Sequence, residues 1–285
     1  NILSVRFANI FFRPVWNKQY IESIQVSAME SLGVENRGGY YDQAGALRDM
    51  VQSHLLQVVA LTTMKEPEYY DAGIVRDQKN KIISELRSYN QSNINQNTVR
   101  GQYTGYRSET KVSENSETET YVALKTYIDN PDFENVPIYI RTGKSLSRRS
   151  TDIHIKFKKA AMTAFSNLFC ELRSNVLSIR LQPNEGIRLR ALIKEPGFGV
   201  RLQDVNMEYL YSDTYNNLPD AYERLILDCL LGDQSLFTRS DEIESSWKFV
   251  TNILSLWKSE HSEIHEYAKG SDGPERANEL TKWIE

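Results

Sequence analysis

The stretch that decides the fold lies between residues 136 and 211. Five runs within it alternate apolar with polar or charged residues: VPIYIR (136–141), TDIHIKFKK (151–159), VLSIRLQ (176–182), GIRLRALI (186–193) and VRLQDVNMEYLY (200–211). Such alternation is typical of antiparallel strands that bury one face and leave the other in water. Turn-forming residues such as Gly143 and Pro196-Gly197 separate several of the runs. The sequence therefore predicts a large, mainly antiparallel β-sheet.

Helical patterns flank this stretch on both sides. Residues 42–64 place apolar residues at steps of three and four, with Asp42 as the expected N-cap and Pro67 beyond the end. We expect further helices at 75–89, 220–233 and 241–260. Helices beside a mainly antiparallel sheet make an α+β fold, which we expect to be a single domain over residues 1–285.

The region before the sheet adds one strand and two loops. Residues 21–29 partly alternate apolar with polar residues and stop at Glu30, which suits a half-buried strand. The polar segments 91–98 and 107–120 contain few apolar residues, so we expect both to be exposed loops.

Composition excludes several classes of protein. The 285 residues carry a net charge of −4, which argues against non-specific binding to nucleic acid. No apolar run approaches the roughly 20 residues of a membrane-spanning helix. Cys170 and Cys229 stand in no metal-binding or redox motif, so we expect two buried free thiols and a cytoplasmic location. The chain opens on Asn1 with no signal-peptide pattern, and we expect that a preceding segment was left out.

Phosphate-binding loops and metal motifs are absent from the sequence. Neither G-x-G-x-x-G nor G-x-x-x-x-G-K-[ST] occurs, because Gly197-Phe-Gly199 continues into an expected strand. His261 and His265 are spaced as a metal pair on a helix would be, but no further ligand flanks them. The sequence therefore predicts no nucleotide-phosphate loop and no metal site of its own.

Two features remain as candidates for chemistry. His54 and Asp49 lie on the expected helix 42–64, about 140° apart around an α-helix, so they do not form a same-face pair. His54 is of the type that accepts a proton at physiological pH, although a buried core histidine is the more common interpretation of the spacing. Lys144, Arg148 and Arg149 follow a strand and a glycine, and they suit either a phosphate or a solvated basic turn.

Eight collinear motifs resemble one known family. They are RFAN (6–9), Trp16-Asn17, GGYYD (38–42), RDMVQSHLLQ (48–57), RTGK (141–144), RLQPNE (180–185), DAYERLILD (220–228) and Gly273-Pro274. In this order they closely resemble the C-terminal domain of glucose-6-phosphate dehydrogenase, and they cover nearly the whole chain. The resemblance implies an NADP-linked dehydrogenase that oxidises C1 of glucose 6-phosphate to 6-phosphogluconolactone, the first step of the oxidative pentose phosphate pathway.

The resemblance also implies roles for particular residues. His54 matches the family's general base, which removes the proton of the C1 hydroxyl while hydride leaves for the nicotinamide. Glu30 and Asp49 match carboxylates that hold sugar hydroxyls. Three further residues match those placed around the substrate: Lys144, Arg149 and Gln182.

Other properties of the family concern cofactor and assembly. An N-terminal Rossmann domain, which we expect to be absent here, binds NADP in this family and also supplies substrate-phosphate ligands, so we expect this chain alone to be inactive. Arg141 and Arg180 match contacts of a second, structural NADP, but Ser150 and His154 replace the basic residues expected there. The family dimerises through the outer face of the sheet, which predicts a homodimer.

Two other classes of function stay open. One is a non-catalytic sugar-phosphate-binding or assembly module of the same fold. The other is an isomerase or lyase that acts on a sugar phosphate without nicotinamide, and it rests only on the missing nucleotide loop. The presence of His54, Glu30, Asp49 and Lys144 favours the dehydrogenase, since a pocket released from catalysis has no need of a base.

Overall fold

A nine-stranded mixed sheet forms the centre of the computed structural model, which describes residues 1–160, 172–199, 201–215 and 221–284. The strand order is β8-β7-β6-β5-β1-β4-β3-β2-β9. The strands are β1 (Ile21–Met29), β2 (Thr98–Tyr103), β3 (Tyr121–Thr126), β4 (Ile138–Gly143), β5 (Ser150–Phe157), β6 (Val176–Gln182), β7 (Gly186–Lys194), β8 (Leu202–Leu210) and β9 (Ile264–Tyr267).

Pairing within the sheet is mainly antiparallel, which confirms the expected fold class. Only β1 with β4 and β2 with β9 run parallel among the described pairs. The strand expected at 21–29 and the five runs between 136 and 211 are β1 and β4 to β8. Three strands, β2, β3 and β9, were not expected from the sequence.

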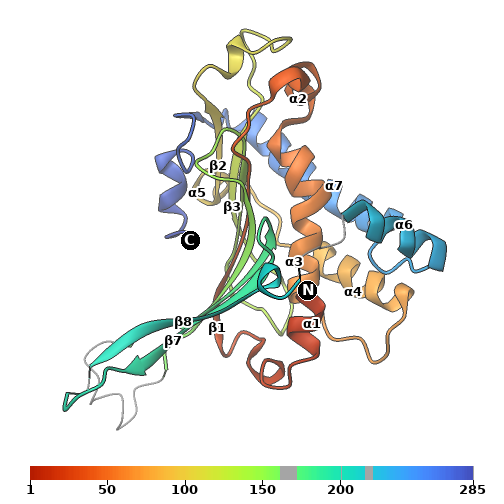
Figure 1. Cartoon of the computed structure of the whole chain (residues 1–285). Coiled ribbons are helices and arrows are strands. Elements are labelled where there is room, and N and C mark those ends of the chain that lie inside the picture. Colours follow the sequence, from red (N-terminus) through yellow and green to blue (C-terminus); the bar gives the residue numbers. More distant parts are fainter. Residues whose placement is uncertain (161–171, 200, 216–220, 285) are drawn as a thin grey trace.

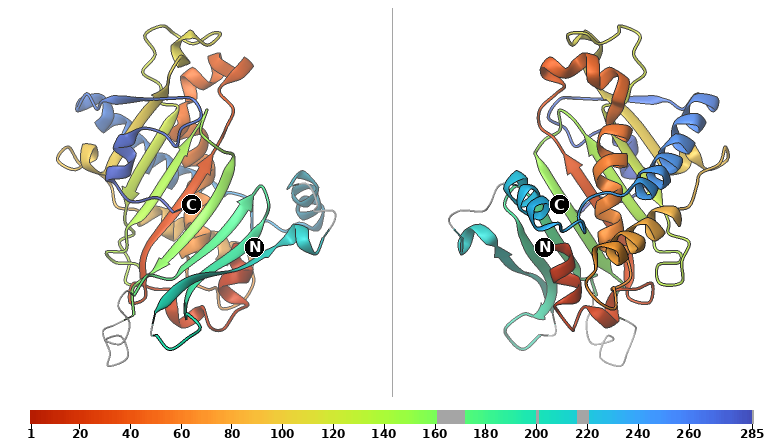
Figure 2. Two further views of the ribbon diagram at one scale, coloured as in Figure 1. Left: turned by 60° about the vertical axis from the view of Figure 1, so that its left-hand side comes forward. Right: turned by 90° about the vertical axis from the view of Figure 1, so that its right-hand side faces the viewer.

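Helices cover one face of the sheet (Figures 1 and 2). The described helices are α1 (Ile2–Phe7), α2 (Gly38–Ala46), a π-helix (Leu47–Leu55), α3 (Leu56–Thr63), α4 (Ala72–Ser84), the short α5 (Ile94–Asn97), α6 (Ala221–Leu231) and α7 (Ser240–Ser259). Of these, α6 lies away from the sheet on the outer side of the layer, with several exposed apolar side chains (Figure 1). The main core lies between these helices and the sheet, where Val26 and Ile140 meet Leu55 and Val250. Within the described residues, no helix is both long and apolar enough to span a membrane.

The C-terminal segment covers part of the opposite face (Figure 2, left). The Gln25 side chain donates to the Lys282 carbonyl at 3.1 Å and accepts from the Ile284 N–H at 2.8 Å. The Arg141 guanidinium lies 4.5 Å from the centre of the Trp283 ring. The strands β7 and β8 extend beyond both the helices and the C-terminal segment as a two-stranded ribbon (Figure 1).

The expected helix at 42–64 is three consecutive elements. Gly45 has a non-helical φ of 73° and breaks α2 just before the π-helix, which then continues as α3. Asp42 is not an N-cap, since α2 begins at Gly38. Its carboxylate instead accepts from the Tyr106 hydroxyl at 2.9 Å and the Ser113 N–H at 3.2 Å.

Three further expectations about single segments are wrong: the exposed loops at 91–98 and 107–120, and the burial of Cys229. Residues 91–98 include the helix α5 and the first residue of β2, and Ile94 and Thr98 are buried. Residues 107–120 are not wholly exposed, because Ser116, Glu119 and Thr120 are buried. The spacing of His261 and His265 is not helical, because His265 lies in β9. Cys229 is an exposed free thiol, while Cys170 falls outside the described residues.

Candidate active site

Four of the residues expected around a substrate lie at one end of neighbouring strands. Met29 at the end of β1 pairs with Gly143 at the end of β4 and with Ser150 at the start of β5. Thr151 in turn pairs with Gln182 at the end of β6. Glu30, Lys144 and Arg149 are the adjoining residues in sequence. Strand register therefore brings Glu30, Lys144, Arg149 and Gln182 to the same edge.

Glu30 and Lys144 form an ion pair at this edge. Because β1 and β4 are parallel, their carboxyl ends meet, and the Lys144 Nζ lies 2.6 Å from the Glu30 Oε2. The Glu30 N–H donates to the Gly143 carbonyl at 3.0 Å, and the Leu146 N–H donates to the Glu30 carbonyl at 2.9 Å. The side chains are 12% exposed for Lys144 and 38% for Glu30. The backbone is thus fixed, while the charged groups remain accessible to a polar ligand.

A group of buried tyrosines supports Lys144. The Tyr41 ring centre lies 5.0 Å from the Lys144 Nζ, a cation–π contact. The Tyr267 hydroxyl donates to the Lys144 carbonyl at 2.7 Å. Burial raises the pKa of Tyr41 well above its usual value, with Glu119, Asp49 and Glu30 adding to the shift. Tyr41 therefore stays a neutral phenol that can face the ammonium group.

Asp49 and His54 both lie in the π-helix. In a π-helix each N–H bonds the carbonyl five residues earlier, and Leu56 donates to the Val51 carbonyl in this way at the end of the element. Residues 49 and 54 are therefore one turn apart and share a face, contrary to the α-helical prediction. The residue pattern does not indicate this, because apolar periodicity over so short a stretch does not distinguish a π-helix from an α-helix.

The surroundings of these two side chains differ. The Tyr40 hydroxyl donates to the Asp49 Oδ1 at 3.3 Å, and Asp49 is half-buried. His54 is exposed, so it is not a core histidine, and its ring has no hydrogen-bond partner in the part of the chain described. The π-helix packs against both β1 and β4. The helix that bears an accessible imidazole and a carboxylate thus packs on the two strands that end next to Glu30 and Lys144.

A basic cavity of about 250 Å³ continues along the same edge onto the sheet face opposite the main helices. Arg149 and Gln182 line it together with Arg148, Arg180 and His154. Arg180 is paired with Glu208 at 2.9 Å. Arg141 does not line this cavity, and its Nε donates to the Ser27 Oγ at 3.0 Å. Arg141 and Arg180 nevertheless share one row, since Arg180 pairs with Asp152, Asp152 with Ser27 and Ser27 with Arg141.

His154 in this cavity is held neutral. It is 5% exposed, and its Nδ1 lies 2.8 Å from the Ser178 Oγ. Burial lowers its pKa to about 4, with Arg141 and Arg148 acting in the same direction. Phosphate binding in this cavity would therefore depend on the arginines rather than on the imidazole.

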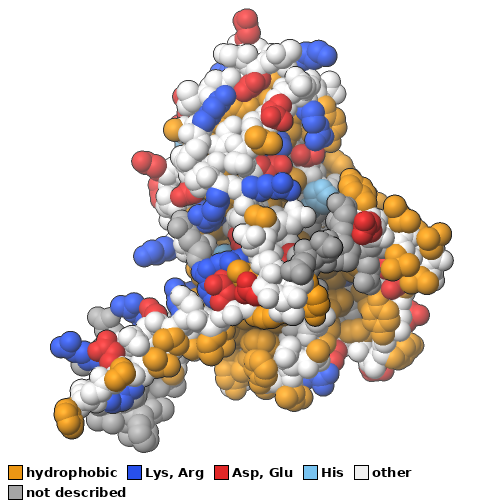
Figure 3. Space-filling model, in the orientation of Figure 1, with side chains coloured by type: hydrophobic (Ala, Val, Ile, Leu, Met, Phe, Trp, Pro, Cys, Tyr) orange, Lys and Arg blue, Asp and Glu red, His pale blue; other side chains and the backbone are white. Residues whose placement is uncertain are grey.

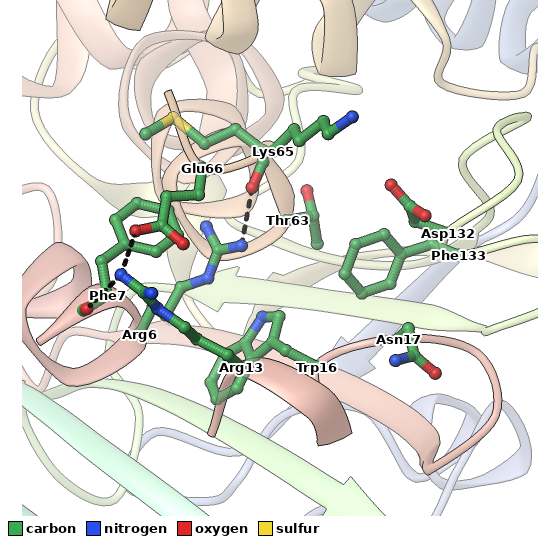
Figure 4. A pocket seen from close by; sticks show the side chains of 11 residues that line it. Arg6, Phe7, Arg13, Trp16, Asn17, Thr63, Lys65, Glu66, Asp132 and Phe133 are labelled. Carbon is green, nitrogen blue, oxygen red and sulfur yellow. Dashed lines mark hydrogen bonds and ion pairs between the residues drawn. The ribbon is translucent and has the colours of Figure 1, made fainter. Parts of the chain in front are cut away.

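A separate cavity of about 210 Å³ lies at the RFAN motif (Figure 4). The Arg6 guanidinium there donates to the Leu61 carbonyl at 2.7 Å and the Met64 carbonyl at 2.6 Å. These acceptors are at the C-terminal end of α3, where a cation is favourable. Burial lowers the pKa of Arg6 to about 9, so it remains charged at neutral pH. None of the expected site residues lines this cavity, and Arg6 serves to end α3.

Comparisons with known proteins agree with the resemblance. Residues 3–284 match the family model described as glucose-6-phosphate dehydrogenase, C-terminal domain. A glucose-6-phosphate 1-dehydrogenase of Treponema pallidum is 44% identical over 99% of this chain and 57% of its own length. That of Borreliella burgdorferi is 41% identical over 98% of this chain and 60% of its own length. The chain thus spans less than two thirds of these relatives.

Two solved structures have the same fold. Glucose-6-phosphate 1-dehydrogenase from Mycobacterium avium superposes with a TM-score of 0.85 at 34% identity, over 98% of this chain and 58% of that one. A glucose-6-phosphate dehydrogenase in complex with its substrate glucose 6-phosphate gives a TM-score of 0.89 at 35% identity, over 100% of this chain and 60% of that one.

Proposed function

Because this chain belongs to the glucose-6-phosphate dehydrogenase family through its C-terminal domain, we propose that it forms the substrate side of an NADP-linked oxidation of glucose 6-phosphate at C1. The product is 6-phosphogluconolactone. One observation supports the proposal most directly. The ends of neighbouring strands bring together Glu30, Lys144, Arg149 and Gln182, and the π-helix that bears Asp49 and His54 packs on two of these strands.

His54 acts as the general base in this proposal. Its exposed imidazole takes the proton from the C1 hydroxyl, and this requires a neutral ring at working pH. No described residue hydrogen-bonds to the His54 ring and fixes which of its nitrogens carries the proton. A carboxylate from outside the described residues would therefore orient the ring. Glu30 and Asp49 accept hydrogen bonds from sugar hydroxyls, which fixes the distance between C1 and the base.

Lys144, Arg149 and Gln182 surround the substrate. Lys144 supplies a point charge next to Glu30, whereas Arg149 offers forked donors that suit a phosphate. Both partners of the Lys144–Glu30 pair remain partly accessible, with side chains 12% and 38% exposed. A sugar phosphate can therefore take over either partner.

The main site for NADP does not fit the described residues. Gly197-Phe-Gly199 is the only G-x-G of the sequence, and it lies between β7 and β8 rather than between a strand and a helix. We propose that this site belongs to a further part of the enzyme, as the partial coverage of the relatives suggests. NADP, when bound, supplies the hydride acceptor. The 285-residue chain alone is then inactive.

A second, structural NADP is a separate proposal. Arg180 with Arg148, Arg149 and Arg188 makes a cavity of about 250 Å³ that suits phosphate groups, and Arg141 adjoins it. His154 is neutral and Ser150 is uncharged, so fewer cations are present than the family pattern has. We therefore expect weak binding at most.

A homodimer through the sheet is also proposed. The β7–β8 ribbon leaves apolar side chains uncovered, with Met207 54% and Ile193 43% exposed. These side chains lie on the side that continues the core face, so the proposed interface includes this side of the ribbon as well as the outer face that the resemblance implies. Figure 3 shows hydrophobic side chains gathered along this ribbon. Exposed patches of this kind mark interfaces.

The exposed thiol of Cys229 suits a reducing cytoplasmic enzyme.

The experiment that tests the function is an assay of NADP reduction with glucose 6-phosphate, using the protein expressed from its natural reading frame. We expect turnover that depends on both substrates. A protein that is folded but inert towards glucose 6-phosphate and other hexose phosphates would overturn the proposal.

A further inference from the structure

A buried carboxylate lies at the start of the π-helix. Glu119 is 3% exposed, although it belongs to a polar segment. Its Oε1 accepts from the Leu47 N–H at 2.9 Å, and its carbonyl accepts from the Ala46 N–H at 2.9 Å. Ala46 is the N-cap of the π-helix and Leu47 its first residue. Glu119 therefore satisfies two donors that a helix start leaves without partners of its own.

The segment around Glu119 is hydrogen-bonded to the sheet. The Thr120 N–H donates to the Gly101 carbonyl at 2.8 Å, next to the strand pair β2–β3. The Gln102 side chain donates to the Thr118 carbonyl at 2.8 Å. Both flanking residues are thus tied to β2, so Glu119 anchors the helix start to the sheet.

Burial and local contacts act in opposite directions on the charge of Glu119, and burial has the larger effect. Burial raises the pKa of Glu119, while the Leu47 N–H and the charges of Arg48 and Arg100 act the other way. A carboxylate at a helix start also interacts favourably with the positive end of the helix dipole. A hydrogen bond from a backbone N–H to a carboxylate is stronger than one between neutral groups.

The backbone leaves room for this carboxylate only at glycine. Gly45 has a φ of 73°, and a Cβ at that position would lie 2.5 Å from the Glu119 Oε1. The absence of a side chain at Gly45, where the helix breaks, therefore leaves the space that the Glu119 carboxylate occupies. A side chain at residue 45 would displace Glu119.

Helix register links this anchor to the site. The π-helical pattern sets Asp49 and His54 one turn apart on a shared face, whereas an α-helix would separate them by about 140°. Long π-helical stretches are rare, so one that spans Leu47–Leu55 needs support at its ends. We propose that Glu119 is a positioning residue that holds the start of the π-helix and so places Asp49 and His54 for the reaction. This inference rests on the proposed function.

The test compares variants of the protein expressed from its natural reading frame. Glu119→Ala removes the acceptor of the Leu47 N–H, and we expect kcat with glucose 6-phosphate and NADP to fall about 10- to 100-fold, since small displacements of reacting groups are costly. Glu119→Gln keeps an acceptor oxygen and is expected to remain within about threefold of wild type. In the same proteins, amide hydrogen exchange over residues 44–56 should speed up in Glu119→Ala.

A matched control separates positioning from stability. Asp71 accepts from the Gly73 and Ile74 N–H groups at the start of α4, which bears no expected site residue. Asp71→Ala should lower the unfolding free energy by about 1 kcal/mol yet leave kcat and the exchange of residues 44–56 unchanged. Should Glu119→Ala fail to fold, Glu119→Asp replaces it, because its shorter side chain draws the acceptor away from Leu47; we then expect a kcat loss of about fivefold or more.

Two results would overturn the inference. One is a folded Glu119→Ala protein with kcat within about twofold of wild type. The other is a loss of kcat in Asp71→Ala as large as that in Glu119→Ala. If wild type itself is inert towards glucose 6-phosphate, the proposed function fails, and hydrogen exchange alone decides whether Glu119 holds the π-helix.

Discussion

At the scale of single residues, His54 is the histidine whose place in the structure suits a base. It is exposed on a helix that packs against β1 and β4, whereas His154 is buried and neutral and His265 lies in the edge strand β9. The sequence could name His54 through the resemblance but not through spacing. Spacing alone favoured a core position, because Val51 and Leu55 around it are core residues.

We expect His54→Asn to lower kcat by about 10² or more while KM for glucose 6-phosphate changes little, because the base acts on the transition state and contributes little to substrate binding. Steady-state kinetics of the protein from its natural reading frame measure this. His265→Asn is the control and should leave kcat unchanged. An unaltered kcat in His54→Asn would remove His54 from the mechanism.

His154 gives the protein a stability that depends on pH. Its folded-state pKa of about 4 lies below the ordinary value of 6.5 because burial disfavours the imidazolium. Between these pH values the unfolded chain binds more protons, so this contribution to stability is complete above pH 6.5 and is lost as pH falls towards 4. The loss by pH 4 amounts to about 3 kcal/mol.

Urea unfolding of wild type and His154→Asn across this range isolates that contribution, since carboxylates such as Asp152 titrate in both proteins. The unfolding free energy of wild type should fall relative to that of the variant as pH decreases. Parallel pH curves for the two proteins would show that the histidine is not held neutral.

At the scale of elements, the break at Gly45 separates α2 from the π-helix. Gly45→Ala meets two obstacles, the positive φ of 73° and the approach to Glu119. Gly105 has a φ of 87° with its nearest neighbour 4.0 Å away, so Gly105→Ala meets only the backbone strain. We expect each to destabilise by about 1 kcal/mol or more for the positive φ, and Gly45→Ala to cost more and also to lower kcat.

Chemical denaturation of the two alanine variants gives the comparison. Equal unfolding free energies for the two variants would mean that Glu119 moves aside without cost. The close approach of residues 45 and 119 would then contribute nothing to stability.

Much of this element structure could be predicted from sequence, and the exceptions have physical causes. Alternation located β1 and β4 to β8. Apolar residues of β1 and β4 to β7 face the core beneath the helices, whereas β8 alternates in the ribbon beyond it and contains no buried residue. Alternation missed β3, where Tyr121 to Leu124 are all buried and do not alternate. The π-helix was missed because α- and π-helices share apolar periodicity over so few residues. Glu119 was predicted to lie in an exposed loop because its neighbours in sequence are polar. In the structure it is buried, and its carboxylate accepts a hydrogen bond from the start of the π-helix.

At the scale of the whole molecule, the β7–β8 ribbon extends past the helices and the C-terminal segment (Figures 1 and 2). We expect it to be covered by a second copy in solution, since Met207 and Ile193 are exposed on its apolar side. Multi-angle light scattering at micromolar concentration should give a dimer, and Met207→Glu should shift it towards monomer. A wild-type monomer at that concentration would refute the homodimer.

We propose that the strand ends carrying Glu30, Lys144, Arg149 and Gln182 form the substrate side. The described residues contain no glycine-rich loop for the nicotinamide cofactor. The account therefore divides the reaction between this chain and a further part of the enzyme. The most direct measurement is NADP reduction with glucose 6-phosphate by the 285-residue chain and by the protein from its natural reading frame, side by side. We predict turnover only by the latter. Turnover by the 285-residue chain alone, or by neither protein when both are folded, would contradict the account.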